Sequence, residues 1–138
     1  MEETRIFTAT EQDGTKRPSI LLVEDDPATA GLYVDYLYGL LQYSVALVPT
    51  IDAAKQVLDK TDFDIVVCDY RLGDQYGTEF LKHVKGREKP LPFLLLSNGI
   101  TEEQLRLLRS MGLDSFLPKA EVHINEIGKE IERLLSQT

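Results

Sequence analysis

The sequence predicts an α/β protein with a single doubly wound, five-stranded parallel sheet, strand order 2-1-3-4-5, and helices on both faces. Two observations lead to this class. Five short apolar segments alternate strictly with five segments of helical periodicity. The first and third apolar segments, "SILLV" and "DIVVCD", are continuous rather than alternating, which is typical of parallel strands covered on both faces.

The length and composition indicate one folded domain. A chain of 138 residues is the size of a single domain, and its apolar fraction of 43% is ordinary for a globular protein. Residues 1–17 are polar, with Gly14 and Pro18 as breakers, so we expect an N-terminal tail there. The domain itself is then expected to cover residues 18–137.

The charge balance restricts the partners. Fifteen Lys and Arg against 23 Asp and Glu give a net charge of −8, which argues against direct nucleic-acid binding. It favours a metal cation or partners with basic patches. The single Cys68 excludes an internal disulfide and indicates a reducing compartment. No signal peptide or spanning segment is recognisable, so we expect a cytoplasmic protein without membrane contact.

The first half of the domain reads as strand, helix, strand, helix. Residues 19–23 form the first strand, and leucines at helical spacing predict a helix over residues 27–41, although two glycines weaken it. "YSVALV" predicts a second strand over residues 43–48. Residues 50–60 place Ala54, Val57 and Leu58 on one helical face.

The second half continues the alternation. Residues 64–69 predict the third strand, and "GDQYG" predicts a turn before a helix that carries Phe80, Leu81 and Val84. Residues 91–97 predict the fourth strand.

The last part of the chain supplies the fifth strand and two helices. Thr101 opens a helix that runs through Met111 and is stopped by Gly112. "DSFLP" predicts the short fifth strand, and the final helix carries isoleucines and Leu134 at spacings of three and four residues.

Acidic residues stand where two of the strands end. Glu24 and Asp25 follow the first strand, and Asp69 ends the third. In open α/β sheets ligands bind beyond the carboxyl ends of the strands, at the point where the strand order reverses, here between strands one and three. We therefore expect the three carboxylates to converge. Asp26 differs, because its position before Pro27 makes it a good helix N-cap.

Such a cluster requires a compensating cation. Neighbouring carboxylates raise one another's pKa unless positive charge is present, and Mg²⁺ prefers oxygen ligands of this kind. A carboxylate beside that ion can attack phosphorus to form an aspartyl-phosphate. Ser97, at the end of the fourth strand, could bond a phosphoryl oxygen, and Lys119 could pair with Asp69 or its phosphate. Each of these residues taken singly could equally be a helix cap, a turn residue or a solvated surface residue. Their combination at four strand ends favours a common phosphoryl-binding site.

Four segments in order carry a resemblance to a known family. "LLVEDDP", "VVCDYRLGDQYG", "LLLSNG" and "DSFLPKA" resemble the motifs of the response-regulator receiver domain of two-component signalling, which has the CheY-like, flavodoxin-like fold. The resemblance covers residues 18–137. It implies that Asp69 is the phosphoacceptor. It also implies that Asp25 binds Mg²⁺ directly, Glu24 through water, and Arg71 through its backbone carbonyl.

The same resemblance assigns a switch. Ser97 and Lys119 would hold the phosphoryl oxygens, and Phe116 would be the aromatic residue that turns inward when Ser97 shifts; the residues alone predict Phe116 as plain core. The sequence departs from the family most clearly at two places. Gly73 stands where proline is usual, and Ala120 stands where a cis proline usually follows the lysine. We expect a trans bond at Ala120, because a cis bond there costs about 2.5–4 kcal/mol.

The predicted function is therefore a phosphorylation switch. A histidine kinase or phosphotransfer protein would donate a phosphoryl group to Asp69, with self-catalysed phosphorylation and dephosphorylation but no separate enzyme activity. The face formed by the helix from Thr101, the strand 114–118 and the last helix would then bind a second copy or an output domain.

Three other functions compete with it. A receiver fold uncoupled from phosphorylation would be an interaction module. A phosphatase of haloacid-dehalogenase type expects a second aspartate at position 71, which is arginine. A flavin carrier would meet repulsion between "EDDP" and the cofactor phosphate.

Overall fold

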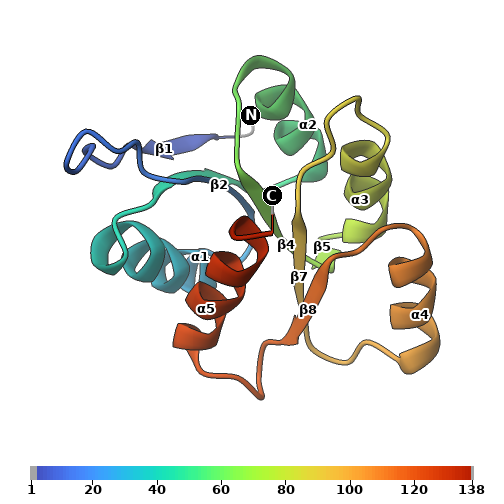
Figure 1. Ribbon diagram of the computed structural model, residues 1–138. Coiled ribbons are helices and arrows are strands. Elements are labelled where there is room, and N and C mark those ends of the chain that lie inside the picture. Colours follow the sequence, from blue (N-terminus) through green and yellow to red (C-terminus); the bar gives the residue numbers. More distant parts are fainter. Residues whose placement is uncertain (1–2, 138) are drawn as a thin grey trace.

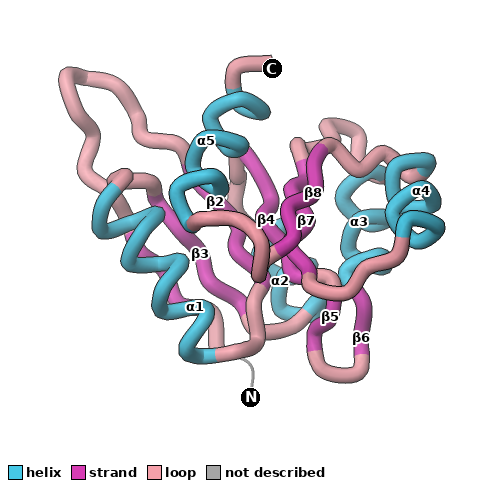
Figure 2. Tube along the Cα trace, turned by 90° about the horizontal axis from the view of Figure 1, so that it is seen from below, coloured by secondary structure: helices cyan, strands magenta, loops and turns pink. Residues whose placement is uncertain are grey.

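The computed structural model describes residues 3–137 and confirms the predicted α/β class. A central sheet lies between two layers of helices (Figures 1 and 2). Its strands are β1 (Arg5–Phe7), β2 (Ser19–Val23), β3 (Ser44–Val48), β4 (Ile65–Asp69), β7 (Phe93–Ser97) and β8 (Ser115–Pro118). They are ordered β1-β3-β2-β4-β7-β8, and the last five are parallel. Their arrangement is consistent with the predicted order 2-1-3-4-5.

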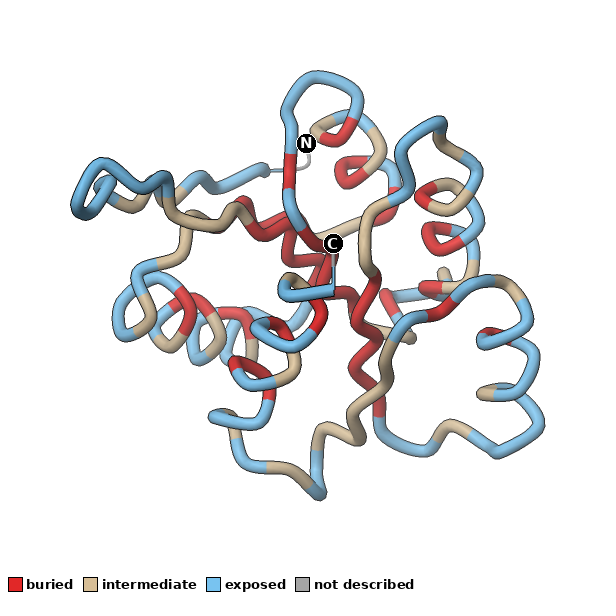
Figure 3. The backbone as a smooth tube through the Cα atoms, in the orientation of Figure 1, coloured by how far each residue is buried: buried red, intermediate tan, exposed pale blue. Residues whose placement is uncertain are grey.

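The helices divide between the two faces of the sheet. They are α1 (Pro27–Val34), the π-helix η1 (Asp35–Leu40), α2 (Ile51–Lys60), α3 (Gly77–Lys85), α4 (Glu102–Ser110) and α5 (Ile124–Leu135). Successive residues of a strand point to opposite faces. On β2, Ile20 and Leu22 therefore pack with α1, η1 and α5, whereas Leu21 and Val23 pack with α2, α3 and α4. Figure 3 shows the buried residues concentrated along the strands and the inner sides of the helices.

The predicted helix starts are confirmed. Asp26 caps α1, since its side chain accepts a hydrogen bond from the backbone N–H of Thr29 at 2.9 Å. Thr101 and Gln104 form a reciprocal capping box at the start of α4. Among the described residues, no helix is both long enough and apolar enough to cross a membrane.

The predicted helix over residues 27–41 changes form partway along. After Val34 the chain continues as a π-helix, and the N–H of Leu41 donates to the carbonyl oxygen of Tyr36, five residues earlier. The Tyr36 ring lies against Gly128 of α5, where an added Cβ would overlap the tyrosine hydroxyl. Gly128 is therefore required by the close packing of the two helices.

The polar N-terminal segment contributes a strand. β1 pairs antiparallel with β3 and so forms one edge of the sheet. Phe7 is half-buried, and its ring centroid lies 5.5 Å from that of Tyr38. A three-residue strand is too short to show periodicity, which is why the sequence pattern gave no sign of it.

Of the turn predicted for "GDQYG", Gly73 and Asp74 form the tip of a small hairpin, whereas the next two residues belong to its second strand and Gly77 begins α3. β5 (Arg71–Leu72) and β6 (Gln75–Tyr76) pair antiparallel, and Gly73 between them has a φ of 62°, which favours glycine. This hairpin follows β4 directly and therefore lies at the carboxyl edge of the sheet.

Candidate functional site

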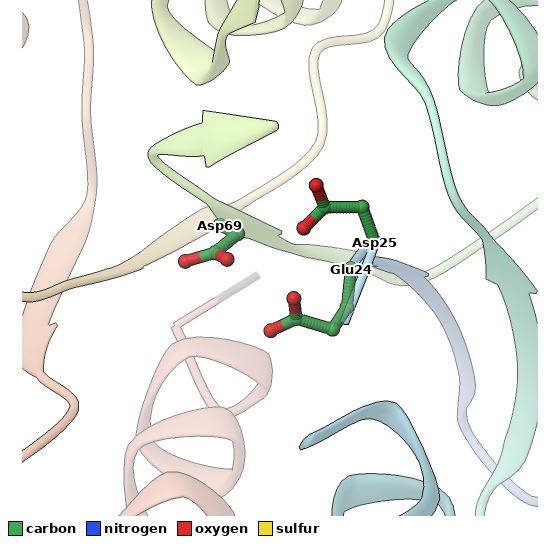
Figure 4. A group of neighbouring side chains, drawn as sticks. All are labelled: Glu24, Asp25 and Asp69. Atoms are coloured by element: carbon green, nitrogen blue, oxygen red, sulfur yellow. The ribbon is translucent and has the colours of Figure 1, made fainter. Parts of the chain in front are cut away.

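Glu24, Asp25 and Asp69 converge at the carboxyl edge of the sheet, as predicted. One carboxylate oxygen from each lies within 4.8 Å of the other two. The convergence follows from strand pairing: β2 and β4 are parallel neighbours in which Val23 pairs with Cys68, so the residues that follow emerge together. Figure 4 shows the Glu24 and Asp25 side chains extending toward the side of the sheet edge where Asp69 lies.

The three acids differ in their surroundings. Glu24 is buried, with 3% of its surface exposed, whereas Asp69 is half-buried and Asp25 is exposed. Glu24 Oε2 accepts a hydrogen bond from the backbone N–H of Asp26 at 3.1 Å. Asp25 Oδ2 accepts one from the N–H of Gly73 at 3.0 Å, which ties it to the β5–β6 hairpin. The cluster is thus buried on one side and open to solvent on the other.

Lys119, directly after β8, reaches two of these acids. Its Nζ lies 2.7 Å from Glu24 Oε1 and 3.0 Å from Asp69 Oδ2. The sequence predicted the partner Asp69 but not Glu24. Burial raises the pKa of Glu24 to about 7, against the lowering effect of Lys119. For Lys119 burial lowers the pKa, but the bonds to the two carboxylates outweigh it and the pKa rises to about 12.

The tyrosine ring of Tyr33, on α1, adds to the environment of the lysine. Its centroid lies 5.9 Å from Lys119 Nζ, within reach of a cation–π interaction. Burial raises the pKa of the Tyr33 hydroxyl, so the ring stays neutral at physiological pH. The approach of Tyr33 to Lys119 depends on how α1 docks on the sheet, so no local sequence pattern indicates it.

Ser97 is buried at the end of β7. Its hydroxyl donates to the carbonyl oxygen of Asn98 at 3.1 Å and is not bonded to Asp69. Ser97, Asp69 and Lys119 line one hollow of about 440 Å³, together with Tyr70, Arg71 and Asn98. The three residues predicted to handle a phosphoryl group therefore face a common space large enough for it.

Arg71 and Phe116 are the two remaining residues to which the family resemblance assigned a role. Arg71 is an exposed residue of β5 whose guanidinium stands 5.8 Å from the ring centroid of Tyr76. Phe116 of β8 is half-buried and packs against the core on the side of α2, α3 and α4. Their assignments, as a carbonyl ligand and as a switch residue, remain predictions.

The departures from the family pattern have visible consequences. Gly73 occupies the left-handed region at the hairpin tip, and its N–H binds Asp25. Ala120 follows Lys119 through a trans peptide bond, and none of the peptide bonds between residues 3 and 137 is cis. The expected trans bond is confirmed. The Ala120 N–H donates to Asn98 Oδ1 at 2.8 Å, a contact that the sequence alone did not indicate.

Comparison with known proteins identifies the family of this chain. The family model described as response regulator receiver domain matches residues 20–132. The transcriptional regulatory protein ZraR of Salmonella typhimurium is 31% identical over 126 residues, covering 81% of this chain and 28% of that protein. The regulatory protein VirG of Agrobacterium tumefaciens is 28% identical over 101 residues, covering 72% of this chain and 37% of that protein.

A solved structure shows the same likeness. The non-phosphorylated HemR receiver domain from Leptospira biflexa is 33% identical, with a TM-score of 0.80 over 88% of this chain and 97% of that one. This chain therefore belongs to the response regulator receiver domain family. It spans between a quarter and two-fifths of the length of these curated relatives.

Proposed function

Since this chain is a response regulator receiver domain, we propose that Asp69 accepts a phosphoryl group from a phosphohistidine of a kinase or phosphotransfer protein. The convergence of Asp69 with Glu24, Asp25 and Lys119 in one hollow supports this proposal most directly. The complete set favours phosphorylation over an interaction module that has lost it. The single, buried Cys68 fits a protein that works in the reducing cytoplasm.

The transfer to Asp69 forms one bond to phosphorus and breaks another. A carboxylate oxygen of Asp69 attacks phosphorus, and the P–N bond of the phosphohistidine breaks. The imidazole leaves with the bonding electron pair and regains its neutral form by taking up a proton. Hydrolysis reverses the state: water attacks phosphorus, the bond to Asp69 breaks, and inorganic phosphate leaves. The domain would thus catalyse both its own modification and the removal of the phosphoryl group.

Lys119 would pair with the negative charge of the transferred phosphoryl group. Its Nζ is already 3.0 Å from Asp69 Oδ2, so it can pair with the added negative charge without crossing the hollow. The Ser97 hydroxyl would exchange its bond to the Asn98 carbonyl for one to a phosphoryl oxygen. This exchange is the movement through which the site would signal.

The acids suit Mg²⁺. Three carboxylates have oxygens within 4.8 Å of one another, and they are the kind of oxygen ligand that this ion prefers. Lys119 contacts two of them, Glu24 and Asp69, so its single positive charge offsets only part of the three negative charges. Glu24, Asp25 and Asp69 would hold it, with the carbonyl of Arg71. When bound, the ion would offset the repulsion between the acidic residues and the incoming phosphoryl group.

The output of the switch would be the surface formed by α4, β8 and α5. Ser97 pairs with Pro118 at the end of β8, and Phe116 lies two residues earlier on the same strand. A shift of Ser97 would therefore displace the paired strand β8, which carries Phe116. Leu107 of α4 is 59% exposed, an apolar side chain available to a second copy or an output domain.

Intact-mass spectrometry after incubation with acetyl phosphate and Mg²⁺ tests the proposal. The wild-type protein should gain one phosphoryl group, and Asp69→Asn should gain none. Asp74→Asn, which changes an exposed aspartate in the adjacent hairpin, is the matched control and should be labelled like the wild type. Absence of labelling in the wild type, or equal labelling of Asp69→Asn, would overturn the phosphoacceptor role and leave the interaction module.

A further inference from the structure

Two loops that leave neighbouring strands are joined beyond the end of the sheet. β7 and β8 pair up to Ser97 and Pro118, and the N–H of Lys119 then donates to the carbonyl oxygen of Ser97 at 3.0 Å. The next backbone N–H, that of Ala120, bonds a side chain and not a backbone carbonyl. The N–H of Ala120 donates to Asn98 Oδ1 at 2.8 Å, so a side chain continues the ladder where the strand has stopped.

This hydrogen bond depends on both residue types. A proline at position 120 would have no N–H to donate. Gly99, which follows Asn98, has a φ of 74°, so the backbone turns out of the extended strand conformation there. The short Asn98 side chain bonds the segment that follows β8, placing its amide oxygen at the backbone N–H of Ala120 in the adjacent loop.

We propose that Asn98 is a positioning residue for Lys119, a role that rests on the proposed function. The bond fixes the peptide group that follows Lys119, and thereby the direction in which the lysine leaves the backbone toward Asp69. Asn98 accepts both the Ser97 hydroxyl, at its backbone carbonyl, and the peptide N–H that follows Lys119, at its side chain.

The hydrogen bond itself is tested on the Ala120 amide. In Asn98→Ala, solvent exchange of the Ala120 amide proton, measured by NMR, should accelerate roughly three- to tenfold. Asp64→Ala is the matched control, because Asp64 Oδ2 also accepts an exposed, long-range backbone N–H at 2.8 Å, that of Ser19, at the opposite end of the strands. It should leave the Ala120 amide unchanged. An unchanged Ala120 amide in Asn98→Ala would overturn the proposal whether or not the protein is phosphorylated.

The positioning role is tested by a double-mutant cycle on the rate of phosphorylation by acetyl phosphate. Asn98→Ala should slow labelling of Asp69 roughly three- to tenfold, while the thermal midpoint changes no more than in Asp64→Ala. In a Lys119→Ala background the effect of Asn98→Ala should vanish.

The outcomes of the cycle separate this role from the proposed function. An equal loss in both backgrounds, or no loss in either, would show that Asn98 does not act through Lys119. A wild-type protein that is never labelled would overturn the proposed function, and with it the positioning role, while the amide measurement would still decide whether the hydrogen bond forms.

Discussion

Lys119 and Glu24 form an ion pair almost removed from water. The Nζ–Oε1 distance is 2.7 Å, and only 1% of the Glu24 side chain and 16% of the Lys119 side chain are exposed. The pair joins the end of β8 to the end of β2, across the strands between them. Because Glu24 also belongs to the acidic cluster, its protonation state should affect the stability of the fold, the affinity for a metal ion and the ion pair with Lys119.

The raised pKa of Glu24 makes stability depend on pH. Burial raises that pKa from 4.5 to about 7, so between these values the folded state binds more protons than the unfolded state. The stabilising contribution is complete below the lower value and is lost as pH rises through the upper one. In the absence of Mg²⁺, the unfolding free energy of the wild type relative to Glu24→Gln should fall by on the order of 3 kcal/mol across this window.

Urea unfolding at several pH values measures this difference. Glu88→Gln, which changes an exposed glutamate in a loop, is the control and should follow the wild type. A difference between wild type and Glu24→Gln that stays constant with pH would show that the carboxyl is not shifted.

Mg²⁺ affinity should also depend on the protonation of Glu24, but it should rise with pH whereas the stability contribution falls. A proton on Glu24 competes with the ion, so affinity should be about tenfold weaker near pH 6 than near pH 8. Titration calorimetry gives the dissociation constants. Glu24→Gln should bind more weakly with a much flatter pH dependence; an equally steep dependence in that variant would assign the competing proton to another group.

Gly128→Ala should destabilise the protein by about 1–3 kcal/mol, because the added methyl group overlaps the Tyr36 hydroxyl on η1. Gly31→Ala in α1 is the control. Its Cβ meets nothing within 4 Å, so it should stabilise by about 0.5–1 kcal/mol. Thermal unfolding compares them, and Tyr36→Phe should recover part of the loss. A neutral Gly128→Ala would mean that the helices separate at little cost.

Gly77→Ala should act on the phosphoacceptor through the backbone. A Cβ at Gly77 would lie 2.7 Å from the carbonyl oxygen of Asp69, so the two segments must move apart. Labelling by acetyl phosphate should slow at least about tenfold, since small misplacements of reacting groups are costly. Gly31→Ala again serves as the control. Wild-type labelling of Gly77→Ala would show that the loop absorbs the change elsewhere.

Removal of residues 1–10 should leave the five parallel strands folded. Loss of β1 takes away the half-buried Phe7 and uncovers the edge of β3, which should cost about 1–2 kcal/mol. Phe7→Ala alone should account for most of this loss in urea unfolding. Asp69 should still be labelled; a truncated chain that fails to fold would place β1 within the essential domain.

Much of the fold could be predicted because its information is local. Continuous apolar runs and helical spacings are properties of neighbouring residues, and they located the five parallel strands. The change to a π-helix after Val34 was missed, because the residue that packs there, Gly128, comes from a distant helix. β1 was missed because three residues carry no period.

The site divides in the same way. Residue type and position after a strand were enough to predict Asp69, Ser97 and Lys119 as one group. The bond from Lys119 to Glu24 and the bond from Ala120 to Asn98 were not predictable, because each joins atoms whose separation depends on strand register and loop direction.

By itself the sequence determined the order of strands and helices along the chain. It also determined which acids end the first and third strands, and these acids meet because parallel strands bring their carboxyl ends to one edge. Only the tertiary structure decided which of these acids is buried and which cation neutralises it. Burial and pairing belong to contacts between segments far apart in the chain, and no local pattern encodes those distances.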